Sequence, residues 1–579
     1  MYKRLIYAAA AALMLGGFVT GAAPAQAKEN PVITGQYSDP AAERVVRDTL
    51  PDLPAGVPVR VGTKEPEGLK SEGFELRIGS DEIRIDGADA AGVFYGAQEL
   101  RDRARAGALE TGVVREEPTM RYRGLIEGFY GTPWSHAERL DLIDYLGSHR
   151  MNTFEYAPKD DPYHREKWRE PYPADKLAEL GELVDRAVGN HVDFTFALSP
   201  GLSICYTSES DYEALIAKFE SMYELGVRQF NIPLDDIDYD VWHCAADEEK
   251  YGTGPAAAGK AQADLLSRVQ TEWATPKGDV GPMQMVPTEY YNVDETPYKE
   301  SLRAMDSKVV VHWTGIGVIP TTITREQAAD ARAVFGHEIL IWDNYPVNDY
   351  IAGRLPLGAY TGRDNGLSAE VSGIISNPMN QPSPSKIALY SFGEYGWNDE
   401  TYDAVESWER ALAEAAGESP EVTAALERFA DLNTLDTTLH EEPAPRLRAD
   451  IDAFWEAWDA GDTDAAAEEL DAVLSELAAA PGVIRDGVSD PAFAEQAKAW
   501  LDATELWSSA MRHSLTALVA DNGGDTETAC GEIEDAASDV EAALAIRDVR
   551  EPHSETHPRI ADGVADTFID DVAGRVDCA

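Results

Sequence analysis

Two adjacent carboxylates, Asp235 and Asp236, end an apolar segment at residues 230–236 (FNIPLDD). Neighbouring residues on a strand point to opposite faces, so two adjacent acids seldom both belong to the core. Where a strand ends, the backbone can bend and both side chains can reach one cleft. Two carboxylates in contact cannot ionise independently, which places an acid beside a base. This chemistry suits hydrolysis of a glycosidic bond; a solvated acidic loop is the alternative for the pair alone.

Apolar segments that alternate with amphipathic helices surround this pair. We expect strands at residues 122–130, 153–158, 193–200, 229–236, 282–290, 308–315, 338–346 and 373–379, with helices such as 135–149 and 174–190 between them. Eight strands separated by helices are typical of a (β/α)8 barrel, whose active site lies at the carboxyl ends of the strands. The expected strands end in polar or aromatic residues: Tyr130, Lys159, Asp235, Asp236, Tyr290, Trp313, Asn344 and Asn377.

The barrel, placed at residues 119–400, is flanked by two regions of different pattern. Residues 28–118 contain a hairpin signal, because Phe74 and Ile78 alternate with polar residues before a turn and Ile83 and Ile85 follow it. A helix comes next, which predicts a small α+β domain. Residues 401–579 are rich in Ala, Glu, Asp and Leu with helical periodicity and predict an all-α bundle. The fold class is therefore multidomain, with a central α/β barrel.

The N-terminal 27 residues have the pattern of a secretory signal peptide. Lys3 and Arg4 precede an apolar run, and Ala25-Gln26-Ala27 offers an A-x-A cleavage site. We therefore expect an exported protein, cleaved near Ala27, with no other segment apolar enough to span a bilayer. The formal net charge of −55 argues against nucleic acid and anionic membrane surfaces as partners.

Four cysteines in an exported chain suggest two disulfides. Cys205 and Cys244 follow consecutive expected strands, whereas Cys530 and Cys578 lie in the C-terminal region. We prefer those two pairs, although four cysteines allow three connectivities. A metal site is the weaker alternative because the sequence has no C-x-x-C spacing.

Several motifs together resemble glycoside hydrolase family 84, which comprises exo-β-N-acetylglucosaminidases including O-GlcNAcases; some members were named hyaluronidases. They are RGLIEGFYGTPWS from Arg123, YAPKDDPYHREKWREPYP ending at Pro173, the aspartate pair, VPTEY (286–290), WTG (313–315), WDNYPVNDY (342–350) and SNPM (376–379). The resemblance is strong over the barrel, plausible over the N-terminal domain and looser over the helical region. The chain departs from the family at Pro233-Leu234, where members often carry an aromatic residue.

The resemblance implies a substrate-assisted reaction, one of the exceptions to the rule of two enzymatic carboxylates. The 2-acetamido oxygen of the sugar attacks its own anomeric carbon and forms an oxazoline. Asp235 resembles the residue that accepts a hydrogen bond from the acetamido N–H. Asp236 resembles the general acid that protonates the leaving oxygen and then acts as base toward water.

The same resemblance assigns substrate-binding roles. The Gly128 carbonyl and Lys159 would bind sugar hydroxyls, Tyr290 would orient the acetamido oxygen, and Trp342 would wall the pocket of the acetamido methyl. Three further residues would hold hydroxyls or the acetamide: Asn344, Asp349 and Asn377. The implied partner is a GlcNAc-containing glycan or glycoprotein, and no cofactor or metal is expected.

Four alternatives remain at this stage. Asp236, Asp238 and Asp240 alternate as in a calcium loop, but Val241 and Asp247 stand where an EF-hand needs Gly and Glu. A metallohydrolase is disfavoured because His312 has no H-x-H partner. A non-catalytic glycan-binding barrel and an endo-acting hyaluronidase are the other two.

Overall fold

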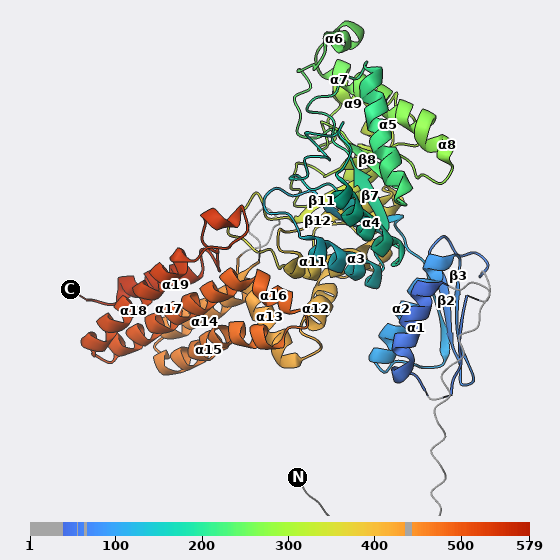
Figure 1. Ribbon diagram of the computed structural model, residues 1–579. Coiled ribbons are helices and arrows are strands. Elements are labelled where there is room, and N and C mark those ends of the chain that lie inside the picture. Colours follow the sequence, from blue (N-terminus) through green and yellow to red (C-terminus); the bar gives the residue numbers. More distant parts are fainter. Residues whose placement is uncertain (1–38, 55, 63–65, 435–442, 579) are drawn as a thin grey trace, which may run out of the picture.

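A computed structural model describes residues 39–54, 56–62, 66–434 and 443–578. The expected signal peptide at residues 1–27 lies outside the described residues. Along the chain the protein forms an α+β domain, a closed barrel and a helical region (Figure 1). The predicted multidomain fold is confirmed, and the boundaries predicted near residues 118 and 400 fall between β4 and β5 and just after α11.

The N-terminal domain contains a four-stranded sheet of order β1-β3-β2-β4. Strands β2 and β3 form the predicted antiparallel hairpin, β2 also pairs antiparallel with β4, and β1 is parallel to β3. Helix α2 buries Val93, Phe94, Ala97 and Leu100 against the sheet. The elements are α1 Pro40–Thr49, η1 Leu50–Asp52, β1 Val59–Val61, β2 Phe74–Ile78, β3 Ile83–Gly87, α2 Ala90–Arg105 and β4 Gly112–Glu116.

Eight parallel strands close the barrel in the order β10-β11-β12-β5-β6-β7-β8-β9. They are β5 Tyr122–Glu127, β6 Thr153–Tyr156, β7 Asp193–Ala197, β8 Gln229–Pro233, β9 Gln284–Val286, β10 Val310–Trp313, β11 Glu338–Pro346 and β12 Gly373–Asn377. Each lies inside one predicted segment. Pairing of β12, the last barrel strand, with β5, the first, closes the ring.

Helices surround the barrel and cover the outer face of its strands (Figure 1). Helix α3 begins with a capping box in which Ser135 and Glu138 satisfy each other's backbone N–H groups. The elements are α3 His136–Ser148, α4 Ala174–Val188, α5 Glu209–Glu224, α6 Ala245–Tyr251, α7 Pro255–Val269, η2 Gln270–Ala274, α8 Thr275–Lys277, α9 Pro297–Leu302, α10 Arg325–Phe335, η3 Leu367–Ala369 and α11 Pro382–Trp397.

The barrel interior holds two kinds of side chain. An apolar cluster includes Ala157, Ala197, Val286 and Trp342. Several polar side chains are also buried in the barrel strands with 0% exposure, among them Glu155, Asn231, Gln284 and His312. The first cluster adjoins the site described below.

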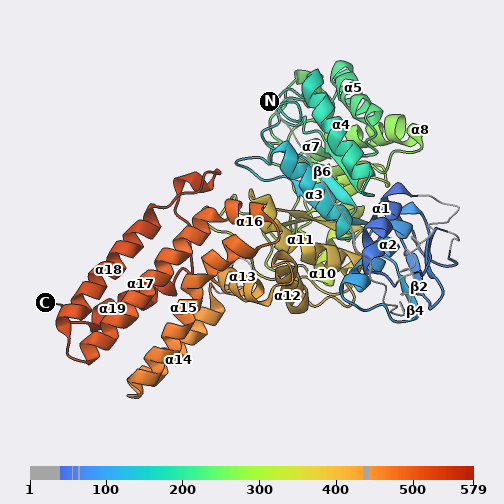
Figure 2. The ribbon, with the colours of Figure 1, turned by 60° about the horizontal axis from the view of Figure 1, so that its bottom comes forward.

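The C-terminal helical region and the α+β domain lie on different sides of the barrel in both views (Figure 1, Figure 2). The helical region touches the barrel through the Thr132 N–H, which donates to the Glu551 carbonyl at 3.0 Å, and through Arg354 and Asp562 at 3.0 Å. Its elements are α12 Ala404–Ala415, α13 Pro420–Leu432, α14 Pro445–Asp459, α15 Thr463–Gly487, α16 Pro491–Gln496, α17 Lys498–Asn522, α18 Thr526–Ala545, η5 His553–Glu555 and α19 Ala565–Arg575.

Two disulfides join the pairs preferred from the sequence, Cys205–Cys244 and Cys530–Cys578. The first links the segments that follow β7 and β8, and the second links α18 to the segment after α19. Among the described residues, no helix combines the length and the apolar character needed to cross a bilayer.

Candidate active site

A cavity of about 280 Å³ opens at the carboxyl ends of the barrel strands. The aspartate pair and all seven predicted binding residues line it: Gly128, Lys159, Asp235, Asp236, Tyr290, Trp342, Asn344, Asp349 and Asn377. They come from segments at or after β5, β6, β8, β9, β11 and β12. The closed barrel therefore brings together residues spread over 250 positions of the sequence, as the strand-end pattern predicts.

Asp235 and Asp236 both reach this cavity because the backbone bends between them. Strand β8 ends at Pro233, and Asp236 adopts a left-handed conformation with φ of 52°. Aspartate is among the few non-glycine residues that tolerate this region. Asp235 is nearly buried, with 10% of its side chain exposed, whereas Asp236 is exposed. The two acids thus occupy different environments in one pocket.

Lys159 is the cation nearest Asp235, with Nζ 3.3 Å from Oδ2. Burial disfavours the ammonium form, but Asp235, Tyr130 and Asp236 together outweigh burial and raise the pKa of Lys159 above its ordinary value. Lys159 therefore stays charged in the pocket. It holds the Asp235 carboxylate while leaving its other oxygen free to accept a hydrogen bond.

Two tyrosines donate hydrogen bonds to Asp236, one to each carboxylate oxygen. Tyr130 Oη donates to Oδ2 at 3.0 Å, and Tyr290 Oη donates to Oδ1 at 3.4 Å. Burial, and then the charge of Asp236, raise the pKa of Tyr290 well above its ordinary value, so this phenol remains a donor. These bonds fix the direction in which Asp236 faces the cavity.

Trp342 forms an apolar wall whose position is fixed on both sides. A Cβ at Gly128 would lie 2.6 Å from Trp342 Cζ2, so only glycine allows this packing. On the other side, Trp342 Nε1 donates to Asn344 Oδ1 at 2.9 Å, and Asn377 Nδ2 donates to the same oxygen at 2.9 Å. The buried Asn377 Oδ1 has no hydrogen-bond partner in the structure.

Asp349 lies where the segment after β11 meets the segment after β5. Its Oδ2 accepts the Tyr130 backbone N–H at 2.7 Å. Burial raises the pKa of Asp349, and this hydrogen bond counters part of the rise. The bond ties together two walls of the cavity.

The sequence reasoning missed several lining residues and misplaced one. Tyr130 was recognised only as a strand end, and Arg165, in the YHREKWR motif, interacts electrostatically with Tyr130 and both aspartates. Arg165 itself does not line the cavity. Besides Tyr130, the lining residues without a predicted role are Val286, Thr314, Val318, Ile319, Val347 and Tyr350. Trp313, expected at the site, is fully buried, and its Nε1 donates to the Asn292 carbonyl. Residues alternate along a strand, so Thr314 faces the cavity instead.

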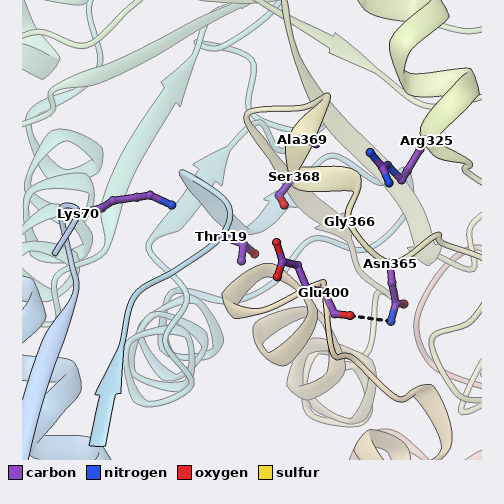
Figure 3. A pocket seen from close by; sticks show the side chains of 8 residues that line it. All are labelled: Lys70, Thr119, Arg325, Asn365, Gly366, Ser368, Ala369 and Glu400. Carbon is purple, nitrogen blue, oxygen red and sulfur yellow. Dashed lines mark hydrogen bonds between the residues drawn. The ribbon is translucent and has the colours of Figure 1, made fainter. Parts of the chain in front are cut away.

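A second cavity, of about 460 Å³, lies elsewhere in the molecule (Figure 3). It is lined by Lys70, Thr119, Arg325, Asn365, Gly366, Ser368, Ala369 and Glu400. None of the predicted site residues is among them. Lys70 is paired with Glu117 at 3.3 Å, and the Asn365 amide donates to the Glu400 carbonyl at 3.2 Å.

Two groups of described side chains have metal-ligand spacing, and both lie outside the active-site cavity. In the first, Cys205 and Cys244 adjoin Asp247, but their sulfurs are joined in a disulfide and cannot act as thiolate ligands. The second contains His513, Glu532 and Asp535, from α17 and α18.

A family model described as beta-N-acetylglucosaminidase matches residues 123–431, slightly more than half of the chain. The barrel, its paired carboxylates and this match define the class of protein as a glycoside hydrolase. A model described as "Glycosyl hydrolase family 20, domain 2" matches residues 26–115, and one described as "Hyaluronidase post-catalytic domain-like" matches residues 446–569. The chain belongs to the beta-N-acetylglucosaminidase family, family 84 of the glycoside hydrolases.

Known relatives agree with this membership. The Protein O-GlcNAcase of Mus musculus is 32% identical over 282 residues, which span 47% of this chain and 29% of that protein. The solved structure of CpGH84B is 31% identical with a TM-score of 0.80 and covers 94% of this chain and 96% of its own. A mutant O-GlcNAc hydrolase of Thermobaculum terrenum is 30% identical with a TM-score of 0.71 and covers 78% and 94%.

Proposed function

We propose that this protein is a retaining exo-β-N-acetylglucosaminidase that removes terminal β-linked GlcNAc from glycoconjugates by substrate-assisted catalysis. The observation that carries the proposal is the placement of Asp235 and Asp236 in one cavity, each held by different partners. A substrate that supplies its own nucleophile needs one group to hold its amide and another to transfer a proton. The aspartate pair offers both.

In the first step the acetamido oxygen attacks C1 and the bond from C1 to the leaving oxygen breaks. Asp236 gives its proton to that oxygen. Asp235 accepts a hydrogen bond from the acetamido N–H, where positive charge develops as the oxazoline forms. In the second step water attacks C1, Asp236 takes a proton from this water, and the bond from C1 to the acetamido oxygen breaks, which opens the oxazoline ring. Two inversions at C1 give net retention.

The remaining residues support binding of one GlcNAc unit. Trp342 would wall the acetamido methyl, and Tyr290 would turn its hydroxyl from Asp236 toward the acetamido oxygen. The free oxygen of Asn377 and the Gly128 carbonyl would accept sugar hydroxyls. Lys159, Asn344 and Asp349 complete the polar lining of the cavity.

The size of the cavity favours an exo-acting enzyme. A volume of about 280 Å³ fits a single sugar better than a polysaccharide segment. The Tyr130–Asp349 bond joins the walls at one side. The endo-acting hyaluronidase alternative draws support from the description of the family model that matches residues 446–569.

The test is turnover of an aryl β-N-acetylglucosaminide by the purified protein. Hydrolysis would separate the proposal from a non-catalytic glycan-binding protein. A second assay follows hyaluronan: loss of chain length without release of terminal sugar would support endo action and contradict the proposal. A panel of GlcNAc-bearing glycopeptides, compared with chitobiose, then identifies the preferred aglycone.

We also propose that the protein is exported, on the pattern of residues 1–27. Expression of the full-length gene should place the protein outside the cytoplasm, with an N-terminus at Lys28. Retention in the cytoplasm with Met1 intact would contradict export.

A further inference from the structure

A buried carboxyl lies inside the barrel below the active-site cavity. Glu155, on β6, is fully buried in a polar layer with Asn231, Gln284 and His312. Asn231 Nδ2 donates to Glu155 Oε1 at 2.5 Å, and His312 Nε2 lies 2.9 Å from Gln284 Oε1. Glu155 Oε2 has no hydrogen-bond partner. The mechanism described above uses none of these four residues.

This layer lies close to the catalytic pair. Lys159 is four residues beyond Glu155, past the end of β6 at Tyr156, and Asp235 is four residues beyond Asn231, past the end of β8 at Pro233. The charges of both Lys159 and Asp235 act on Glu155. The Glu155–Asn231 hydrogen bond therefore spans from β6 to β8 beneath the Lys159–Asp235 ion pair, which spans the same two segments. The residues two positions beyond Glu155 and Thr195 are small, Ala157 just after β6 and Ala197 at the end of β7, and both are buried in the interior cluster.

Glu155 has no cation of its own. Lys159 is already bonded to Asp235, and His312 Nε2, at 4.0 Å, belongs to an imidazole that is also fully buried. Among the described residues, the side chains in register with Glu155 on the two adjacent strands, Ile126 on β5 and Thr195 on β7, are uncharged. An ionised carboxylate buried without a partner is strongly unfavourable, and such groups take up a proton instead.

We propose that Glu155 carries a proton in the folded enzyme and acts as a positioning residue, because its neutral carboxyl leaves Lys159 to Asp235 alone. An ionised Glu155 would compete for Lys159 and would repel the Asp235 carboxylate from below. The role of Asp235 in this inference rests on the proposed function.

Electrostatics agree with this geometry. Burial raises the pKa of Glu155 to about 8. The hydrogen bond from Asn231 lowers this pKa in part, and the charge of Asp235 raises it again. Burial lowers the pKa of His312 to about 3, so the imidazole is neutral as well. A carboxyl whose pKa is raised on folding destabilises the folded state as pH rises above its unfolded value and up to its folded value. For Glu155 this window runs from 4.5 to about 8.

The first test compares thermal unfolding of the wild type and Glu155→Gln between pH 5 and 8. The variant should be the more stable, by a Tm difference that is small at pH 5 and grows toward pH 8. Asp211→Asn is the matched control, since buried Asp211 accepts two hydrogen bonds from Arg169, which together with the Cys205 N–H outweigh burial and lower its pKa. This control should lose stability at pH 8. A Tm difference for Glu155→Gln that does not change with pH would overturn the proposal.

The second test uses an aryl substrate with an activated leaving group, for which acid assistance by Asp236 matters little. The wild-type kcat/KM should fall as pH rises through about 8, and Glu155→Gln should extend the plateau to higher pH. Superimposable profiles would overturn the positioning role even if the Tm result is positive. An inactive wild type with a positive Tm result would contradict the proposed function instead. Should Glu155→Gln fail to fold, Glu155→Met removes the ionisable group and should show the same changes.

Discussion

The indole of Trp342 packs directly on the backbone of Gly128, where a Cβ would lie only 2.6 Å from Cζ2. Gly128→Ala should therefore push Trp342 out of its hydrogen bond with Asn344 and distort the acetamide wall. Overpacking of this kind costs about 1–3 kcal/mol. Expressed as lost substrate binding, that cost raises KM for a GlcNAc substrate roughly 5- to 150-fold.

The control for this variant is Gly181→Ala on α4, where an added Cβ would meet its nearest neighbour, Leu225, at 3.6 Å. It should leave KM unchanged and should not destabilise the protein, because alanine is favoured over glycine in a helix. Wild-type kinetics in Gly128→Ala would contradict the assigned position of Trp342.

Asp235→Asn should abolish most turnover, even for substrates with good leaving groups. The neutral side chain of asparagine cannot stabilise the positive charge that develops at the acetamido N–H of the substrate. Attack by the acetamido oxygen therefore fails. Loss of one preorganised electrostatic contact of this kind costs about 10²- to 10³-fold in kcat. The measurement is kcat for an activated aryl glycoside, and a fall below roughly 10-fold would exclude the assigned role.

Asp236→Asn should affect substrates according to their leaving groups. General acid catalysis contributes about 10²- to 10⁴-fold, which a poor leaving group needs and an activated one does not. We expect large losses with the former and small losses with the latter. The control is Asp238→Asn, two residues further on and exposed, which should leave both rates unchanged. Equal losses for both substrate types would contradict the acid assignment.

Removal of the Cys205–Cys244 disulfide should destabilise the protein without removing any cavity-lining residue. The bond closes a loop of 39 residues, for which chain entropy predicts about 3–4 kcal/mol. Cys205→Ser with Cys244→Ser, followed by denaturant unfolding, measures this loss. Unchanged stability would mean that the loop is constrained by its other contacts, such as the Asp247 hydrogen bonds to Tyr206 and Thr207.

The barrel was predictable because strands buried on both faces form continuous apolar runs bounded by polar residues. All eight expected segments contain a strand, but several were drawn too long. The predicted segment 282–290 holds only Gln284–Val286 as strand, since its polar end, with Tyr290, already belongs to the loop that lines the cavity. The chemistry at strand ends thus obscured where regular structure stops.

Orientation around the barrel was less predictable, because it depends on register. Trp313 was expected at the site, yet His312 and Thr314 occupy the inward face. Glu155 likewise stood in the expected strand 153–158 without a sign that it faces inward. A polar residue in an apolar run does not by itself show whether its side chain faces the barrel interior or the surrounding helices. That is settled only by the register of the neighbouring strands.

The central claim is that the sugar's own amide is the nucleophile. The most direct measurement is kcat/KM for a series of aryl β-glucosaminides whose N-acetyl group carries none, one, two or three fluorines. Fluorine withdraws electrons from the amide oxygen, so the account predicts a steep, progressive fall along the series. Equal rates across the series, or comparable cleavage of the aryl glucoside that lacks the amide, would contradict it.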